Sequence, residues 1–177
     1  DAPVPAFTID EPPHPDPVET LGARFANDLP TLLFVCHSGG GGTLVHMKRL
    51  VAMLGDRANT LFLFGDAQRL VLTAEPGLEN SGFSFRTAVD EDRLVTILRR
   101  IGVYRADVYH TLGFEDVAER ILTRLRIPYD MTLVDYHSVA VRLHLTGANG
   151  CFLGEDALAA RDPAIVRTSP LPTIVNA

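Results

Sequence analysis

The sequence has no tryptophan, only two cysteines and no long run of apolar residues. A transmembrane helix needs about 20 consecutive apolar residues, and a secretory leader needs a basic segment before an apolar one, so we predict neither. Cys36 and Cys151 fit no zinc-binding spacing, and His137 and His144 have no third ligand near them. The sequence therefore predicts no metal, and a reduced, cytoplasmic setting is the simpler interpretation.

Basic residues are also few. Lys and Arg total 16 against 22 acidic residues, which gives a formal net charge of −6. A nucleic-acid-binding protein usually shows a basic patch, and none is visible here. The arginines that do cluster fall in predicted helices, where they are interpreted as solvent-facing residues and partners of the helix dipole. They are Arg99, Arg100, Arg120, Arg124 and Arg126.

Prolines divide the chain of 177 residues, of which 46% are hydrophobic. They crowd residues 1–20, which predicts that neither a helix nor a central strand forms there. We therefore predict an extended arm or linker over 1–28, one domain over 29–165 and a connector over 166–177. Because the first residue is not Met, we expect a fragment or a processed chain.

Strand-like and helix-like patterns alternate within the domain. Three helices are indicated: one from Leu44 to Leu54, one that begins after Asp90 and ends at Ile101, and one over Phe114–Arg126. Gly55 and Gly102 are predicted to end the first two. The predicted strands are Thr31–Cys36, Thr60–Phe64, Arg69–Thr73, Phe83–Thr87, Asp107–His110 and Tyr129–Val134. Such alternation favours right-handed βαβ units. The predicted class is α/β: a Rossmann-like, mainly parallel sheet with helices on both faces.

A glycine run follows the first predicted strand. It comprises Gly39, Gly40, Gly41 and Gly42, and Thr43 comes next. A glycine-rich loop before a helix presents backbone N–H groups that suit a phosphate, although a flexible loop or close helix–sheet packing would also use glycine. The run lacks the Gly-Lys-Ser/Thr of a nucleotide-triphosphate loop. Leu44 also breaks the dinucleotide fingerprint, so a dinucleotide-dependent enzyme that uses Asp66 for the ribose stays an alternative.

Polar residues follow several predicted strands. His37 ends the first strand and His110 a later one, and Asp135, Tyr136 and His137 follow the last. Since open α/β sheets bind ligands at the carboxyl ends of their strands, we expect these residues to line one crevice. We predict His110 and Asp135 as catalytic residues, and His37, Tyr136 and His137 as acceptor-binding residues. The alternative is that they cap turns and satisfy backbone carbonyls.

Three segments resemble family 4-like glycosyltransferases of GT-B fold. Residues 33–43 are similar to the family's first strand and glycine-rich loop, and residues 108–113 to its strand that ends in His. Residues 127–136 resemble the "PYD-T-HDY" pattern of bacterial polysaccharide and O-antigen enzymes, with Gly154-Glu155 following as in those proteins. This chain has Val134 where that pattern has its His.

The resemblance implies the acceptor-side half of a GT-B enzyme. Such enzymes move a sugar from a nucleotide-sugar donor to a glycan or lipid-linked acceptor, here with retention and without a metal. The donor-binding domain carries two glutamates eight positions apart. Glu11 and Glu19 have that spacing, but four prolines between them make the match a coincidence. A C-terminal domain of the same parent chain is therefore the expected partner. The alternative is a non-catalytic Rossmann-like module that binds a nucleotide or protein.

Overall fold

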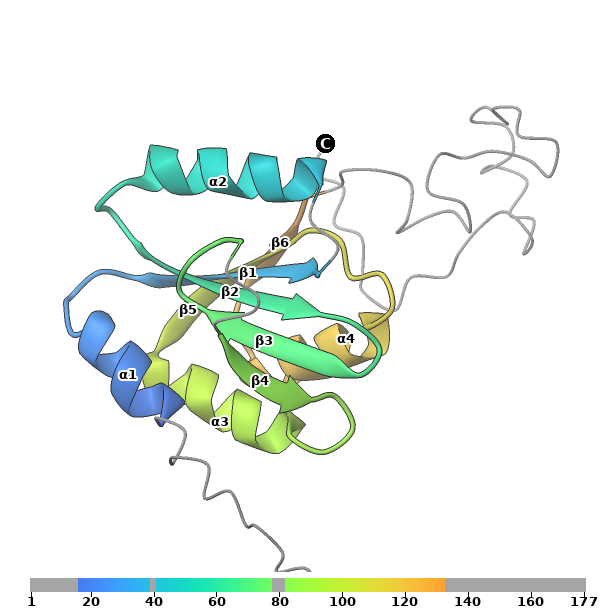
Figure 1. Cartoon of the computed structure of the whole chain (residues 1–177). Helices are drawn as coiled ribbons and strands as arrows, with labels where there is room; N and C mark the ends of the chain where they lie inside the picture. The colour runs from blue at the N-terminus through green and yellow to red at the C-terminus, as the bar shows by residue number, and fades with distance from the viewer. Residues whose placement is uncertain (1–15, 39–40, 78–81, 133–177) are drawn as a thin grey trace, which may run out of the picture.

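The computed structural model describes residues 16–38, 41–77 and 82–132. They form a six-stranded sheet with the order β4-β3-β2-β1-β5-β6 (Figure 1). The strands are β1 (Thr31–His37), β2 (Asn59–Gly65), β3 (Arg69–Thr73), β4 (Phe83–Arg86), β5 (Val103–Val108) and β6 (Tyr129–Met131). The helices are α1 (Pro17–Arg24), α2 (Gly42–Leu54), α3 (Glu91–Ile101) and α4 (Glu115–Leu125).

Four neighbouring strands of the sheet are parallel. Strand β1 pairs in parallel with β2 on one side and β5 on the other, and β5 pairs in parallel with β6. Strands β3 and β4 continue the sheet beyond β2 in antiparallel pairing. The structure therefore confirms the predicted α/β class with a mainly parallel, Rossmann-like sheet.

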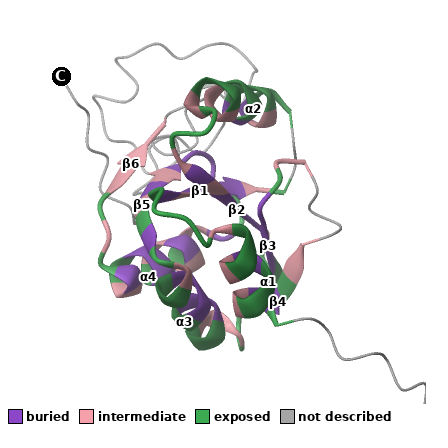
Figure 2. Ribbon diagram, turned by 90° about the vertical axis from the view of Figure 1, so that its left-hand side faces the viewer, coloured by how far each residue is buried: buried purple, intermediate pink, exposed green. Residues whose placement is uncertain are grey.

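Helices cover both faces of this sheet (Figures 1 and 2). Among the described elements, α2 covers one face, and α1, α3 and α4 cover the other. Alternate residues of β1 divide between the two layers: Phe34 packs with Met47 of α2, whereas Leu33 and Val35 join the larger core on the opposite face. Burial of each such side chain stabilises the fold by roughly 1.5–3 kcal/mol, which explains the continuous apolar run in β1.

The predicted arm is wrong for the residues that form α1. Pro17 occupies the start of this helix, where its missing N–H has no helical partner to lose. The Asp16 side chain caps the helix by accepting a hydrogen bond from the Val18 N–H at 2.9 Å. Leu21 anchors α1 in the core. The remainder of the arm, residues 1–15, lies outside the described residues, as do the connector and Gly154-Glu155.

The bounds of β5 and β6 also differ from the sequence prediction. The strand predicted over Asp107–His110 begins at Val103, directly after the helix-ending Gly102, and ends at Val108, so His110 lies beyond it. Gly102 has a φ of +78°, which suits glycine and allows this abrupt change of direction. The described part of the last strand is β6, and Val134 lies outside the described residues.

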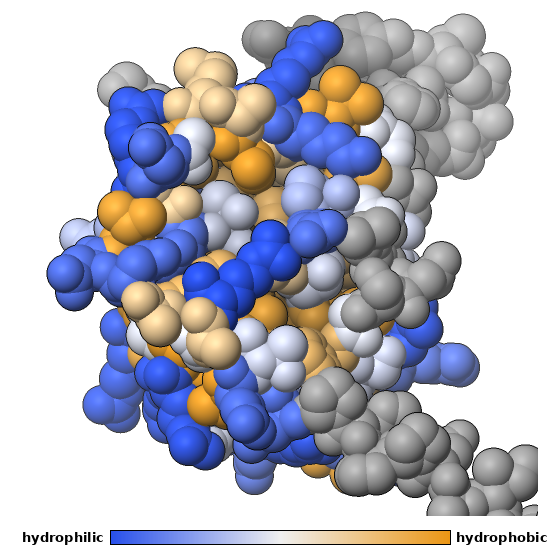
Figure 3. Space-filling model, turned by 60° about the vertical axis from the view of Figure 1, so that its left-hand side comes forward, coloured by the Kyte–Doolittle hydropathy of each residue, from blue (hydrophilic) through white to orange (hydrophobic). Residues whose placement is uncertain are grey.

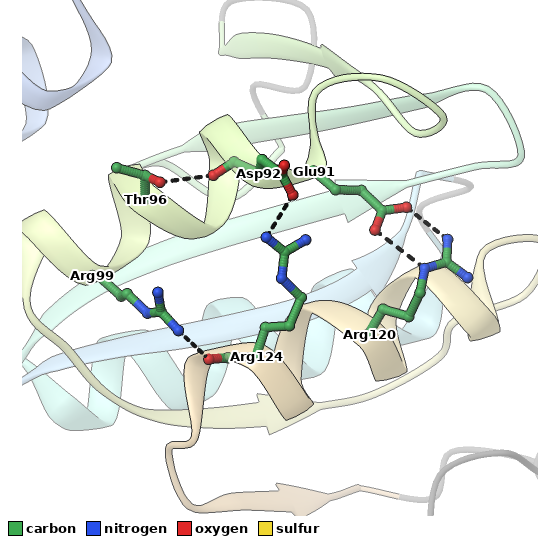
Figure 4. A network of polar contacts seen from close by, with 6 residues as sticks. All are labelled: Glu91, Asp92, Thr96, Arg99, Arg120 and Arg124. Carbon is green, nitrogen blue, oxygen red and sulfur yellow. Dashed lines mark hydrogen bonds and ion pairs between the residues drawn. The ribbon is translucent and has the colours of Figure 1, made fainter.

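Ion pairs join α3 to α4 (Figure 4). Arg120 contacts both carboxylate oxygens of Glu91, at 2.6 and 3.1 Å. Arg124 contacts Asp92 at 2.5 Å, and Arg99 donates to the Arg124 carbonyl at 2.5 Å. Each exposed pair contributes only about 0–1 kcal/mol. The side chains of Arg99, Arg120 and Arg124 therefore link α3 to α4 and do not form a basic patch without partners.

Two glycines provide a test of the packing. A Cβ added to Gly65 would lie 2.7 Å from the Phe114 ring, whereas one added to Gly22 of α1 would meet nothing within 4 Å. We expect Gly65→Ala to lower the free energy of unfolding by about 1–3 kcal/mol, because a packed ring must move. Gly22→Ala should raise it by about 0.5–1 kcal/mol. Urea denaturation measures both changes, and equal effects of the two substitutions would contradict this packing.

Candidate functional site

At the carboxyl edge of the parallel strands, the connections that leave two neighbouring strands run in opposite directions. After β1 the chain crosses over the α2 face to β2, and after β5 it crosses over the α4 face to β6. Strands β1 and β5 are neighbours, so the two connections lead away from each other. Open α/β sheets form their ligand crevice at this switch point, and we therefore place the candidate site there.

His37 and His110 meet at this point. His37 is the last residue of β1 and is half-buried, and His110 is only 4% exposed. Their ring centroids lie 4.6 Å apart at an interplanar angle of 66°. The backbone N–H of His37 donates to the backbone carbonyl of His110 at 2.5 Å. The structure thus brings together these two predicted site residues. Their roles with a ligand stay predictions.

The described end of the glycine run forms the start of α2. Gly41 is the N-cap of this helix and has a φ of +81° and a ψ of −154°, a conformation open to glycine and strained for other residues. No side chain caps α2 from this position, and its first turn has no acidic residue. Gly42 is exposed, whereas Thr43 is buried against the sheet. Gly39 and Gly40 lie outside the described residues.

The end of β2 next to the histidine pair is covered by a packed side chain. The Phe114 ring lies over Gly65, and the Gly65 carbonyl accepts a hydrogen bond from the Ser38 N–H at 3.1 Å. Asp66 is used locally: one carboxylate oxygen accepts from the Gln68 and Arg69 N–H groups, each at 2.8 Å. One oxygen of Asp66 therefore shapes the β2–β3 hairpin, and its use for a ribose stays a prediction.

A polar cluster that the sequence prediction missed lies on the α2 side of the same edge. It comprises Asp107 of β5, Tyr109 and Thr132, with His46 of α2 beside them. The Thr132 hydroxyl donates to Asp107 at 3.0 Å, and the Thr132 N–H donates to the Val108 carbonyl at 2.8 Å. The Tyr109 ring packs 5.7 Å from the ring of His46. Strand β6 is thereby fastened to the end of β5.

Burial sets the protonation behaviour of this cluster. It raises the pKa of the Asp107 carboxyl, and the hydrogen bond from the Thr132 hydroxyl opposes that rise. Burial also raises the pKa of the Tyr109 phenol, and the negative charge of Asp107 adds to the effect. Tyr109 is 4% exposed and therefore stays protonated near neutral pH. The sequence contained one signal of this cluster, because Asp107 is an acidic residue at an otherwise apolar strand end.

The predicted site residues that follow the last strand cannot be placed. Asp135, Tyr136 and His137 lie outside the described residues, which end at Thr132. Within residues 16–38, 41–77 and 82–132, no three His, Cys, Asp or Glu side chains group as metal ligands. The expectation of a metal-free site stays a prediction.

Comparison with protein-family models, with curated proteins and with solved structures finds no match to this chain. The resemblance to family 4-like glycosyltransferases therefore rests on the motifs of the sequence alone.

Asp107 gives a pH-dependent prediction. Because its pKa is raised on folding, its contribution to stability is complete below the unfolded-state pKa of about 3.9 and is lost as the pH rises through the folded-state pKa. We expect the free energy of unfolding of the natural chain, relative to Asp107→Asn, to fall as the pH rises from about 4 toward 7. Urea denaturation across this range measures the difference.

Thr132→Val serves as the companion variant. It removes a hydrogen bond that holds the Asp107 pKa down, so it should move the loss of stability to higher pH. A difference between the natural chain and Asp107→Asn that does not change with pH would show that Asp107 is not perturbed by burial.

Proposed function

We propose that this chain is the acceptor-side domain of a GT-B glycosyltransferase. The observation that supports the proposal is that a glycine N-cap and a pair of histidines in contact with each other both follow strand ends at the switch point of the sheet. This arrangement fits the family resemblance of residues 33–43 and 108–113. The reaction proposed is transfer of a sugar from a nucleotide sugar to a glycan or lipid-linked acceptor, with retention of configuration.

The start of α2 would hold the phosphates of the donor. Backbone N–H groups at a helix N-terminus carry partial positive charge and bind anions. A side chain at Gly41 would be strained, and a negative side chain in the first turn would repel phosphate; the sequence has neither. Gly39, Gly40, Gly42 and Thr43 complete this loop in the proposal, and phosphate is held without a metal.

The histidine pair would face the reacting groups. His110 can donate a hydrogen bond to a hydroxyl or phosphate oxygen, and His37 beside it can bind the acceptor. Asp135 would accept hydrogen bonds from sugar hydroxyls, Tyr136 would pack against a sugar face, and His137 would bind the acceptor with them. We propose that the reaction takes place on the cytoplasmic side, at the inner face of the membrane when the acceptor is lipid-linked.

A transfer assay on the full-length parent protein tests this function. We expect His110→Ala and Asp135→Asn each to lower turnover by at least about tenfold, which equals about 1.4 kcal/mol of transition-state stabilisation. Melting temperatures should change little. Residues 1–177 alone should show no turnover, since catalysis requires the donor and the acceptor to be held in one geometry.

Two matched variants control for general damage. Tyr104→Ala removes an exposed aromatic ring from β5, and Asp28→Asn makes the same charge change as Asp135→Asn at an exposed position before β1. Both should keep full activity. If the natural protein binds a nucleotide sugar but transfers nothing to any acceptor, the non-catalytic binding module becomes the better assignment.

A further inference from the structure

A cavity lies between α1 and the hairpin that β3 and β4 form. Its volume is about 620 Å³, within the range of about 300–1,000 Å³ that is usual for small-molecule sites. Residues of α1, of the hairpin and of the first turn of α3 line it. Figure 3, which brings this side of the molecule forward, shows hydrophobic surface between hydrophilic side chains below α2. The size and the mixed lining of the cavity suit a small amphipathic ligand.

The cavity lies away from the histidine pair. Gly65, which pairs with His37 across the sheet, is the partner of Leu70 near the start of β3. The cavity is lined by the other end of that strand and the residues after it, Leu72 to Glu75, together with the start of β4. A ligand in this cavity would therefore occupy a site separate from the switch point of the sheet.

The floor of the cavity is apolar and partly aromatic. All of its apolar residues from the core belong to the larger of the two clusters or pack against it: Leu21, Leu72, Ala74, Phe83 and Phe85. Phe83 is half-buried, so part of its ring is accessible to a ligand. Aromatic rings pack on one another in offset or edge-to-face arrangements. The floor therefore favours a ligand with a flat, aromatic body.

The charged residues that line the cavity carry an excess of positive charge. They are Arg24, Arg93 and Glu75, two cations and one anion. Arg24 and Glu75 pair with each other at 3.1 Å. The exposed Arg93 lies with its guanidinium 5.9 Å from the centroid of the Phe85 ring, and no carboxylate of the described residues forms a salt bridge with it. A guanidinium in this state can bind a ligand carboxylate through two parallel hydrogen bonds.

We propose that the cavity between α1 and the β3–β4 hairpin binds an aromatic monocarboxylate. The ring of the ligand would pack on Phe83, and its carboxylate would pair with Arg93. The hydroxyls of Thr20 and Ser84 line the same cavity and can donate further hydrogen bonds to the carboxylate. A single negative charge matches the excess charge of the lining, whereas a second would be repelled by Glu75. This inference does not depend on the proposed sugar transfer.

An NMR titration of the isotope-labelled, 177-residue chain tests the proposal. The probes are cinnamate and its uncharged amide, cinnamamide, which has the same ring and nearly the same shape. We expect the amide signals of Thr20 and Ser84 to shift on addition of cinnamate, and those of His37 and His110 to stay in place. Cinnamate should bind at least about tenfold more tightly than cinnamamide, because only the acid forms charge-assisted hydrogen bonds with a guanidinium.

Two substitutions of lining residues should change the affinity in opposite directions. Arg93→Met keeps the length of the side chain but removes its charge, so it should weaken binding of cinnamate at least about fivefold and leave binding of cinnamamide unchanged. Glu75→Gln removes the one negative charge of the lining, so it should strengthen binding of cinnamate at least about twofold. Both positions are exposed, so both variants should keep the melting temperature of the natural chain.

Matched substitutions outside the cavity are the controls. Arg100→Met and Asp56→Asn make the same two charge changes at exposed positions that do not line it. Both should bind cinnamate as the natural chain does. Absence of binding, equal affinity for the acid and the amide, or equal losses in Arg93→Met and Arg100→Met would overturn the proposal. So would signal shifts confined to the surroundings of His37, since that result indicates a site at the switch point of the sheet.

Discussion

Burial of β1 on both faces and both edges is the constraint on which the rest of the structure depends. Its backbone groups pair with β2 on one side and β5 on the other, and its side chains alternate between two cores. A central parallel strand of this kind requires crossover connections on opposite faces. The connections that leave β1 and β5 diverge at the carboxyl edge of the sheet, where the rings of His37 and His110 meet.

The two faces of the sheet are built differently. Helices α3 and α4 are joined by ion pairs and pack with α1 over the larger core. Among the described helices, α2 is the one that packs over the smaller aromatic core, where Phe34 stacks on Phe62 at 5.2 Å.

The order of strands and helices was determined by the sequence alone, because continuous apolar runs and helical periodicity report burial directly. The run at Thr31–Cys36 and the stops at Gly55 and Gly102 placed β1, α2 and α3 correctly. Proline density misled the prediction for α1, because a proline in the first turn of a helix is harmless and the Asp16 cap depends on geometry. The convergence of His37 and His110 followed from strand ends that share one edge.

Only the tertiary structure decided which polar residues meet. Asp107, Tyr109 and Thr132 lie at or just beyond the ends of β5 and β6, and they come together because these two strands pair in one register. No local pattern encodes that register. Asp66 likewise looked available for a ribose, and only the fold of the β2–β3 hairpin showed that its carboxylate is held by backbone N–H groups. A sequence pattern reports which side of an element is buried, whereas contacts between elements depend on how those elements pack.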